Sequence, residues 1–240
     1  MPDTPAAHRL IVALDVPDAT AAKSLVNSLG DSVGFYKIGL ELAMTPDYFP
    51  LLDWLVARGH RVFCDLKLHD IPATVGRAVR RLADSGAHLV TVHAGQTAML
   101  DAAAQARGTT LQVVAVTALT SLDQRDLTEL GVATPVDELV LRHARRARAA
   151  GLDGVVCSGH EVGRVRAALG PDALAITPGI RPASDQAASD QKRVMTPQAA
   201  IRAGASHIVV GRPIRDADDP ATAAMSIIDS IEQGLATRDA

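Results

Sequence analysis

The segment Asp65-Leu66-Lys67-Leu68-His69-Asp70 carries the residue types and the spacing best suited to chemistry in this chain. Asp65 and Lys67 stand two apart near the end of an apolar run, and side chains two apart on a strand point to the same side. A carboxylate and an ammonium group held together there can donate a proton or stabilise developing negative charge. A single ion pair at a strand end is more often structural, so this interpretation needs support from other segments.

Charged residues also close the two preceding apolar runs. Asp15 follows the first run and Lys37 lies near the end of the second. With Asp65, Lys67 and Asp70 they predict an alternating array of two lysines and three aspartates in one mouth. Such an array is costly to desolvate, so its simplest explanation is a function. The flanking carboxylates favour the ammonium form of Lys67, which predicts a cationic acid and argues against a Schiff-base aldolase.

Two further motifs predict a phosphate site. The segment TPGIR ends at Arg181, and the segment GRPI places Gly211 beside Arg212. Loops after the seventh and eighth strands of (β/α)8 barrels often hold phosphate through backbone N–H groups, and arginine suits forked contacts to phosphate oxygens. The histidines lack metal-binding spacing, so we expect no metal, and His93 either lines the mouth or is a hydrogen-bonded core residue.

These residues must be positioned by eight short apolar runs that recur at the interval of a strand-helix unit. The runs cover residues 10–16, 33–39, 61–68, 87–94, 111–119, 154–158, 174–180 and 207–214. Segments with helical spacing lie between them, including 73–85 and 136–150. Several helical segments close with a glycine suited to a helix C-cap: Gly59, Gly86, Gly151 and Gly204.

Near-continuous apolar strands imply a parallel sheet covered by helices, which is an α/β fold. Eight such units favour a single-domain (β/α)8 TIM barrel over an open doubly wound sheet, and the first run is not followed by GxGxxG. The length of 240 residues fits one barrel of this class. In a closed barrel the carboxyl ends of all strands meet at one mouth, which would bring the charged residues together.

Composition limits the possible partners and location. A formal net charge of -3 gives no general attraction to nucleic acid or to an anionic membrane. The chain shows no apolar segment long enough to span a membrane and no signal peptide, and Cys64 and Cys157 lie in apolar runs, so we expect a cytoplasmic protein with two buried thiols. Residues 1–8 and 236–240 read as flexible tails, and the polar segment 182–194 reads as a loop on the phosphate side.

Seven motifs occur in order at the expected strand ends: ALDV (13–16), YKIG (36–39), DLKLHDIPATV (65–75), VTALTS (116–121), TPGIRP (177–182), DQKRVMTP (190–197) and VVGRPI (209–214). Through them the chain resembles the bacterial orotidine 5'-phosphate decarboxylases over about residues 9–225. The resemblance implies a homodimer that converts orotidine 5'-phosphate to UMP and CO2, the last step of de novo UMP biosynthesis. It implies no metal or organic cofactor.

The resemblance also implies residue roles. Lys67 would protonate C6 of the pyrimidine, Asp65 would lie beside the departing carboxylate, and Asp15 and Lys37 would bind the ribose hydroxyls. Asp70 would complete the catalytic set. The other implied substrate contacts are Ile71, Thr74, Thr120, Arg181, Gln191, Gly211 and Arg212. Within this set Asp70 and Thr74 would reach across the dimer interface into the neighbouring subunit's site.

Three alternatives stay open at this point. ASDQ occurs twice, so a shifted alignment would replace Gln191 by Gln186 as the phosphate contact. Sugar-phosphate lyases on the same scaffold share the Asp-x-Lys-x-x-Asp pattern, but they use Mg²⁺ and carry a carboxylate where this chain has Lys37. A non-catalytic barrel that senses a phosphorylated pyrimidine would need the phosphate loops but not the array of lysines and aspartates.

Overall fold

The computed structural model describes residues 4–182 and 194–238 and contains a closed parallel barrel in these parts of the chain. The strands follow one another around the barrel in sequence order, and the last pairs with the first. They are β1 (Leu10–Ala13), β2 (Phe35–Gly39), β3 (Arg61–Leu68), β4 (Leu89–His93), β5 (Gln112–Val116), β6 (Gly154–Val156), β7 (Leu174–Thr177) and β8 (His207–Val210). The predicted (β/α)8 architecture is confirmed.

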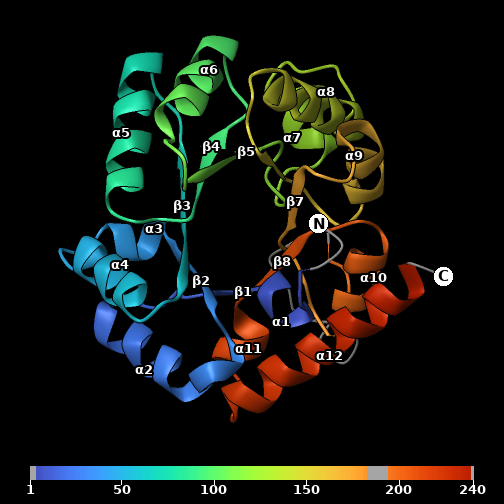
Figure 1. Cartoon of the computed structure of the whole chain (residues 1–240). Coiled ribbons are helices and arrows are strands. Elements are labelled where there is room, and N and C mark those ends of the chain that lie inside the picture. The colour runs from blue at the N-terminus through green and yellow to red at the C-terminus, as the bar shows by residue number, and fades with distance from the viewer. Residues whose placement is uncertain (1–3, 183–193, 239–240) are drawn as a thin grey trace.

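Helices surround the strands on all sides (Figure 1). They are α1 (Ala6–Arg9), α2 (Ala19–Leu29), the 3-10 helix η1 (Gly30–Ser32), α3 (Leu40–Ala43), α4 (Tyr48–Ala57), α5 (Pro72–Asp84), α6 (Thr97–Ala106), α7 (Gln124–Glu129), α8 (Val136–Ala149), α9 (Val162–Leu169), α10 (Pro197–Arg202), α11 (Arg212–Arg215) and α12 (Pro220–Arg238). The glycines predicted to close helical segments all have positive φ: Gly59, Gly86, Gly151 and Gly204. No helix in the described ranges is long and apolar enough to cross a membrane.

The alternation of side chains along each strand produces two apolar layers. One lies between the strands and the helices, and a smaller one fills the inside of the barrel with residues such as Ile11, Phe35 and Phe63. Because side chains two apart share a face, Lys37 follows Phe35 and Asp65 follows Phe63 on the inner face. The same alternation that fills the core therefore leads directly to the charged groups at the mouth.

Several strands end earlier than the apolar runs predict, and the strand predicted over residues 207–214 is wrong after Val210, where β8 ends. Residues 212–215 form α11, with Pro213 in its first turn, where a residue without an N–H group is tolerated. The seventh run likewise stops at Thr177 because Pro178 follows. The apolar character continues past the strands, but proline cannot donate to the ladder of a parallel sheet.

Residues 6–8 and 236–238, which the sequence predicts as parts of flexible tails, lie in helices. Residues 6–8 belong to α1, and the buried Arg9 at its end donates from Nε to the Thr4 carbonyl and from Nη1 to the Ser206 carbonyl. Residues 236–238 form the last part of α12, which packs along α10. Residues 1–3 and 239–240 lie outside the described residues.

Candidate active site

A pocket of about 610 Å³ opens at the carboxyl end of the barrel. Its lining includes side chains that follow or close β1, β2 and β3 on one side and the loops after β7 and β8 on the other. Of the predicted site residues, the lining contains Asp15, Lys37, Asp65, Lys67, Thr120, Arg181, Gly211 and Arg212. Residues from both ends of the chain therefore meet around one cavity, as expected for a closed barrel.

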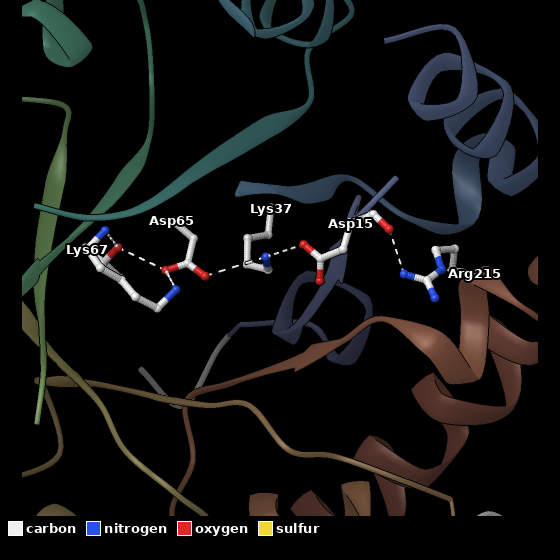
Figure 2. A network of polar contacts seen from close by, with 6 residues as sticks. Asp15, Lys37, Asp65, Lys67 and Arg215 are labelled. Carbon is white, nitrogen blue, oxygen red and sulfur yellow. Dashed lines mark hydrogen bonds and ion pairs between the residues drawn. The ribbon is translucent and has the colours of Figure 1, made fainter. Parts of the chain in front are cut away.

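Four charged side chains form a continuous chain of ion pairs in this pocket (Figure 2). Lys37 Nζ lies 2.7 Å from Asp15 Oδ1 and 3.5 Å from Asp65 Oδ2, and Lys67 Nζ lies 2.8 Å from Asp65 Oδ1. The two central side chains are well shielded, with 10% exposure for Lys37 and 14% for Asp65. The outer two are more open, with 44% for Asp15 and 29% for Lys67, so solvent or a ligand can reach both ends of the row.

The two central groups hold opposite charges in spite of their burial. Burial alone would lower the pKa of Lys37, but Asp65 and Asp15 outweigh it and raise that pKa above its ordinary value. Burial likewise would raise the pKa of Asp65, but Lys37 and Lys67 outweigh it and the pKa of that carboxyl is lowered. The site is therefore charged before any substrate binds, which suits electrostatic stabilisation of a developing charge.

A distortion of β3 brings Asp65 and Lys67 together. The pairing with β4 shifts between Cys64 and Leu68, and Lys67 has a φ of +49°, the one positive φ outside glycine among the described residues. This left-handed conformation is costly for a residue with a β-carbon and is found most often at functional sites. Simple alternation along a regular strand had predicted the shared face but not this bulge.

Asp70 does not join the array within one chain, and its predicted place in the neighbouring subunit's site stays a prediction. Its side chain is exposed, and its Oδ1 accepts a hydrogen bond from the backbone N–H of Ile71 at 2.6 Å. β3 ends at Leu68, and Asp70 lies in the short connection to α5. There it lines a neighbouring hollow together with Thr74. Ile71, the next residue, has 64% exposure and does not line the pocket.

The opposite wall of the pocket contains the predicted phosphate residues. Arg181 is buried and donates from Nη1 to the carbonyl of Ile180 at 2.9 Å. Arg212 begins α11 directly after Gly211, and both line the pocket. The two motifs therefore face the charged row across one cavity.

The polar segment between β7 and α10 has its two ends at this wall. Ile180 pairs with Met195, with the N–H of Arg181 donating to the carbonyl of Met195 at 3.0 Å. The ends of the predicted phosphate-side loop are thus joined beside the pocket. Gln186 and Gln191 lie outside the described residues, so the choice between them stays a prediction.

His93, left undecided from the sequence, lines two hollows beside the pocket and not the pocket itself. Its ring lies 5.4 Å from that of His69, and burial, followed by His69 and Lys67, lowers its pKa. His143 lines the second hollow and has its Nδ1 2.7 Å from the Thr117 carbonyl. In the described parts of the chain, no three histidine, cysteine or acidic residues are grouped so that they could hold a metal ion.

Two residues of the network were not found from the sequence. Thr91, on β4, donates from Oγ1 to Asp65 Oδ1 at 3.0 Å; a polar residue on the inner face of an apolar strand was an available signal. Arg215, on α11, lies beyond Asp15 in Figure 2 and donates from Nη1 to the Asp15 backbone carbonyl at 2.6 Å. No pattern in the sequence connects Arg215 to a carbonyl 200 residues away.

A closed parallel barrel with a preassembled row of charges at its carboxyl end defines a (β/α)8-barrel enzyme. Comparison with known families gives the particular group. A profile described as "Orotidine 5'-phosphate decarboxylase / HUMPS family" matches residues 8–227, and the chain belongs to this family.

Individual relatives agree with that assignment. A protein of Methylococcus capsulatus named orotidine 5'-phosphate decarboxylase is 54% identical over 220 residues, covering 92% of this chain and 90% of the relative. One of the same name from Rhodopseudomonas palustris is 54% identical over 226 residues, covering 94% and 95%. The crystal structure of orotidine 5'-phosphate decarboxylase from Lactobacillus acidophilus superposes with a TM-score of 0.81 at 37% identity, covering 93% of this chain and 99% of that one.

Proposed function

We propose that this protein decarboxylates orotidine 5'-phosphate to UMP and CO2 without a cofactor. The observation that carries the proposal is the unbroken row of ion pairs from Asp15 to Lys67 inside a pocket that is also lined by Arg181 and Arg212. Relatives that are 54% identical to this chain over most of its length bear the name of that activity.

The chemistry fits the Lys67 end of the row. Loss of CO2 from C6 leaves an electron pair in the plane of the pyrimidine ring, where the ring offers no conventional electron sink. An ammonium group fixed beside C6 stabilises that charge in the transition state and then supplies the proton that replaces the carboxylate. Lys67 Nζ is held by Asp65 yet retains access to the pocket, which suits it to this role.

Asp65 has two roles in this proposal. It holds both lysines, and it lies where the substrate carboxylate would enter next to Lys67. Two carboxylates close together repel each other, and the repulsion is relieved as CO2 leaves. The lowered pKa of Asp65 keeps the carboxyl charged when the substrate binds.

The remainder of the pocket binds the nucleotide. Asp15 and Lys37 present an acceptor and a donor suited to the ribose hydroxyls. Arg181, Gly211 and Arg212 form the phosphate side, with Thr120 near the base. The resemblance adds Gln191, which lies outside the described residues, as a further phosphate contact. Phosphate contacts remote from C6 supply binding energy that can be used for orientation at the reacting carbon.

A direct assay tests the proposal. Purified protein is mixed with orotidine 5'-phosphate in buffer with EDTA, and the loss of the substrate's ultraviolet absorbance is followed. We expect turnover that EDTA does not reduce. A folded protein that binds UMP but leaves orotidine 5'-phosphate unchanged would support the nucleotide-sensing alternative instead, and activity abolished by EDTA would support a metal-dependent lyase.

We also propose that the protein is a homodimer whose active sites are shared. Asp70, Ile71 and Thr74 do not line the pocket of their own chain, although the family resemblance gives them substrate contacts. Ile71 is a large apolar side chain with 64% exposure, which a partner subunit would cover. In this arrangement Asp70 of the partner subunit completes the row at Lys67.

Mixing two inactive variants tests the shared site. Lys67→Ala removes a residue of the home pocket, and Asp70→Ala removes one that serves the neighbouring pocket. In a hybrid dimer one of the two sites keeps both residues, so an equal mixture with free exchange recovers about a quarter of the wild-type activity. Subunit exchange shown by a tagged protomer without any recovery would contradict the shared site.

A cytoplasmic location completes the proposal. Both cysteines are buried thiols, which suits a reducing compartment. Fractionation of the source cells followed by immunodetection of the protein tests this point.

A further inference from the structure

Thr91 is a fully buried hydroxyl at the centre of the charged site. It lies on β4 with 0% exposure, and its neighbours on the inner face of the barrel are apolar. Its Oγ1 donates to Asp65 Oδ1 at 3.0 Å and accepts from the backbone N–H of Lys67 at 2.9 Å. One hydroxyl therefore joins the two residues to which the proposed function gives the carboxylate and the proton.

The bulge in β3 explains why Lys67 needs this contact. Cys64 pairs with Val90 and Leu68 pairs with Val92, so three residues of β3 stand opposite Thr91 alone. Within that stretch Lys67 adopts its φ of +49° and its N–H points to the Thr91 hydroxyl. The hydroxyl takes the place of a strand partner and satisfies a backbone donor that would be costly to leave unpaired.

The same hydroxyl fixes the Asp65 carboxylate. Oδ1 receives both the Thr91 hydroxyl and Lys67 Nζ, the latter at 2.8 Å, whereas Oδ2 faces Lys37 Nζ at 3.5 Å. Three donors from three directions determine the plane of the carboxylate. Valine has the shape of threonine without the hydroxyl, so a residue that only filled the core would not need to be threonine.

We propose that Thr91 is a positioning residue for the decarboxylation, which holds the Asp65 carboxylate and the left-handed backbone of Lys67 in their reactive arrangement. Thr91 does not line the pocket, so it acts through these two residues and not on the substrate. This inference rests on the proposed function. It predicts that loss of the hydroxyl impairs the chemical step more than nucleotide binding, because the ribose and phosphate contacts remain.

The test compares Thr91→Val and Thr91→Ser with a matched control, Thr117→Val. Thr117 is also buried, it follows the next strand β5, and its hydroxyl donates to the Val156 carbonyl at 2.9 Å outside the charged row. A misplacement of catalytic groups of about 1 Å reduces rates about 100-fold, so we expect Thr91→Val to lower kcat by about 10- to 100-fold. UMP affinity should stay unchanged, Thr91→Ser should restore most of kcat, and Thr117→Val should keep it.

The pH profile separates positioning from a general loss of structure. Burial raises the pKa of Asp65, the two lysines lower it, and the Thr91 hydrogen bond lowers it further. Removal of that bond therefore moves the acidic limb of the kcat profile to higher pH in Thr91→Val, while Thr91→Ser and Thr117→Val keep the wild-type limb. A variant that is only less stable loses active protein without such a shift.

The outcomes are distinct. If wild-type protein turns over and Thr91→Val keeps the wild-type kcat and acidic limb, the inference is wrong although the proposed function stands. If wild-type protein consumes no orotidine 5'-phosphate, the proposed function fails and the inference fails with it. Should Thr91→Val not fold, as judged by UMP binding, Thr91→Ala provides a second variant without the hydroxyl, and a wild-type kcat in that variant overturns the inference equally.

Discussion

The two ends of the barrel differ in how their ionisable side chains are partnered. At the carboxyl end, two lysines and two aspartates form a row of ion pairs in a pocket that solvent enters. At the amino end, His207 is buried with its Nε2 lacking any hydrogen bond partner among the described residues, and its ring packs edge-on against Phe35 at 5.9 Å. The guanidinium of Arg61 lies over the Phe35 ring, 4.3 Å from the ring centre.

The difference separates activity from stability. The carboxyl end contains a left-handed lysine and a buried row of ion pairs that no stable core requires, so its arrangement serves the reaction. The amino end closes the barrel with aromatic and apolar packing, so its residues serve the fold. Variants at the mouth should therefore lose activity and keep stability, and variants at the amino end should do the reverse.

The largest effect should follow Lys67→Ala. We expect turnover to fall by about four orders of magnitude, because the variant loses both the proton donor and the cation beside C6. The free energy of unfolding in urea should change by no more than about 1 kcal/mol, since the lysine is partly exposed and Asp65 keeps Lys37 as a partner. UMP binding checks that the pocket survives; near-normal turnover would remove Lys67 from the mechanism.

The charged residues at the mouth are predictable from the sequence for a simple physical reason. A period of two along apolar strands places Lys37 and Asp65 on the inner face, and the pairing of β2 with β1 and β3 brings them to Asp15. The phosphate motifs reach the same mouth through closure of the barrel, because β8 pairs with β1. Such regular features depend on local pattern and on one topological rule, so a single sequence is enough to predict them.

The parts that could not be predicted depend on contacts between elements. The bulge at Lys67 exists through the register of β3 against β4, and no local pattern encodes that register. The outward turn after Leu68, which removes Asp70 from its own pocket, depends on how α5 packs. Arg215 reaches the Asp15 carbonyl only because the ends of the chain meet around the barrel.

An intermediate effect should appear at the amino end as pH falls. Burial, followed by Arg61, Arg9 and His8, lowers the pKa of His207 from 6.5 to about 3. Between these values the unfolded chain takes up a proton that the folded protein refuses, so His207 reduces stability by about 1.4 kcal/mol for each pH unit below 6.5. Above pH 6.5 both states are neutral and the effect disappears.

His207→Leu removes this loss of stability at low pH. Relative to wild type, its free energy of unfolding should rise as pH is lowered from about 6.5 towards 3, at about 1.4 kcal/mol per unit. Urea unfolding at a series of pH values measures the difference, with Thr117→Val, which removes no titratable group, as a control that must keep the wild-type slope. Parallel curves for His207→Leu and wild type would show that His207 is not held neutral, and lost turnover at pH 7.5 would break the separation between the two ends.

The smallest effect tests the strain stored at Lys67. At most strand positions a glycine makes the protein less stable than an alanine does, by about 0.5–1 kcal/mol. At a position in the left-handed region the alanine is the costlier residue, by about 1–2 kcal/mol. We therefore expect Lys67→Gly to be more stable than Lys67→Ala by about 1 kcal/mol, with both inactive. Leu66, on the same strand without a positive φ, provides the matched pair, and there alanine should be the more stable. The urea midpoints of the four variants measure the order of stability at each position. If alanine is the more stable residue at both positions, the mouth stores no backbone strain. The contrast between the two ends of the barrel would then rest on charge alone.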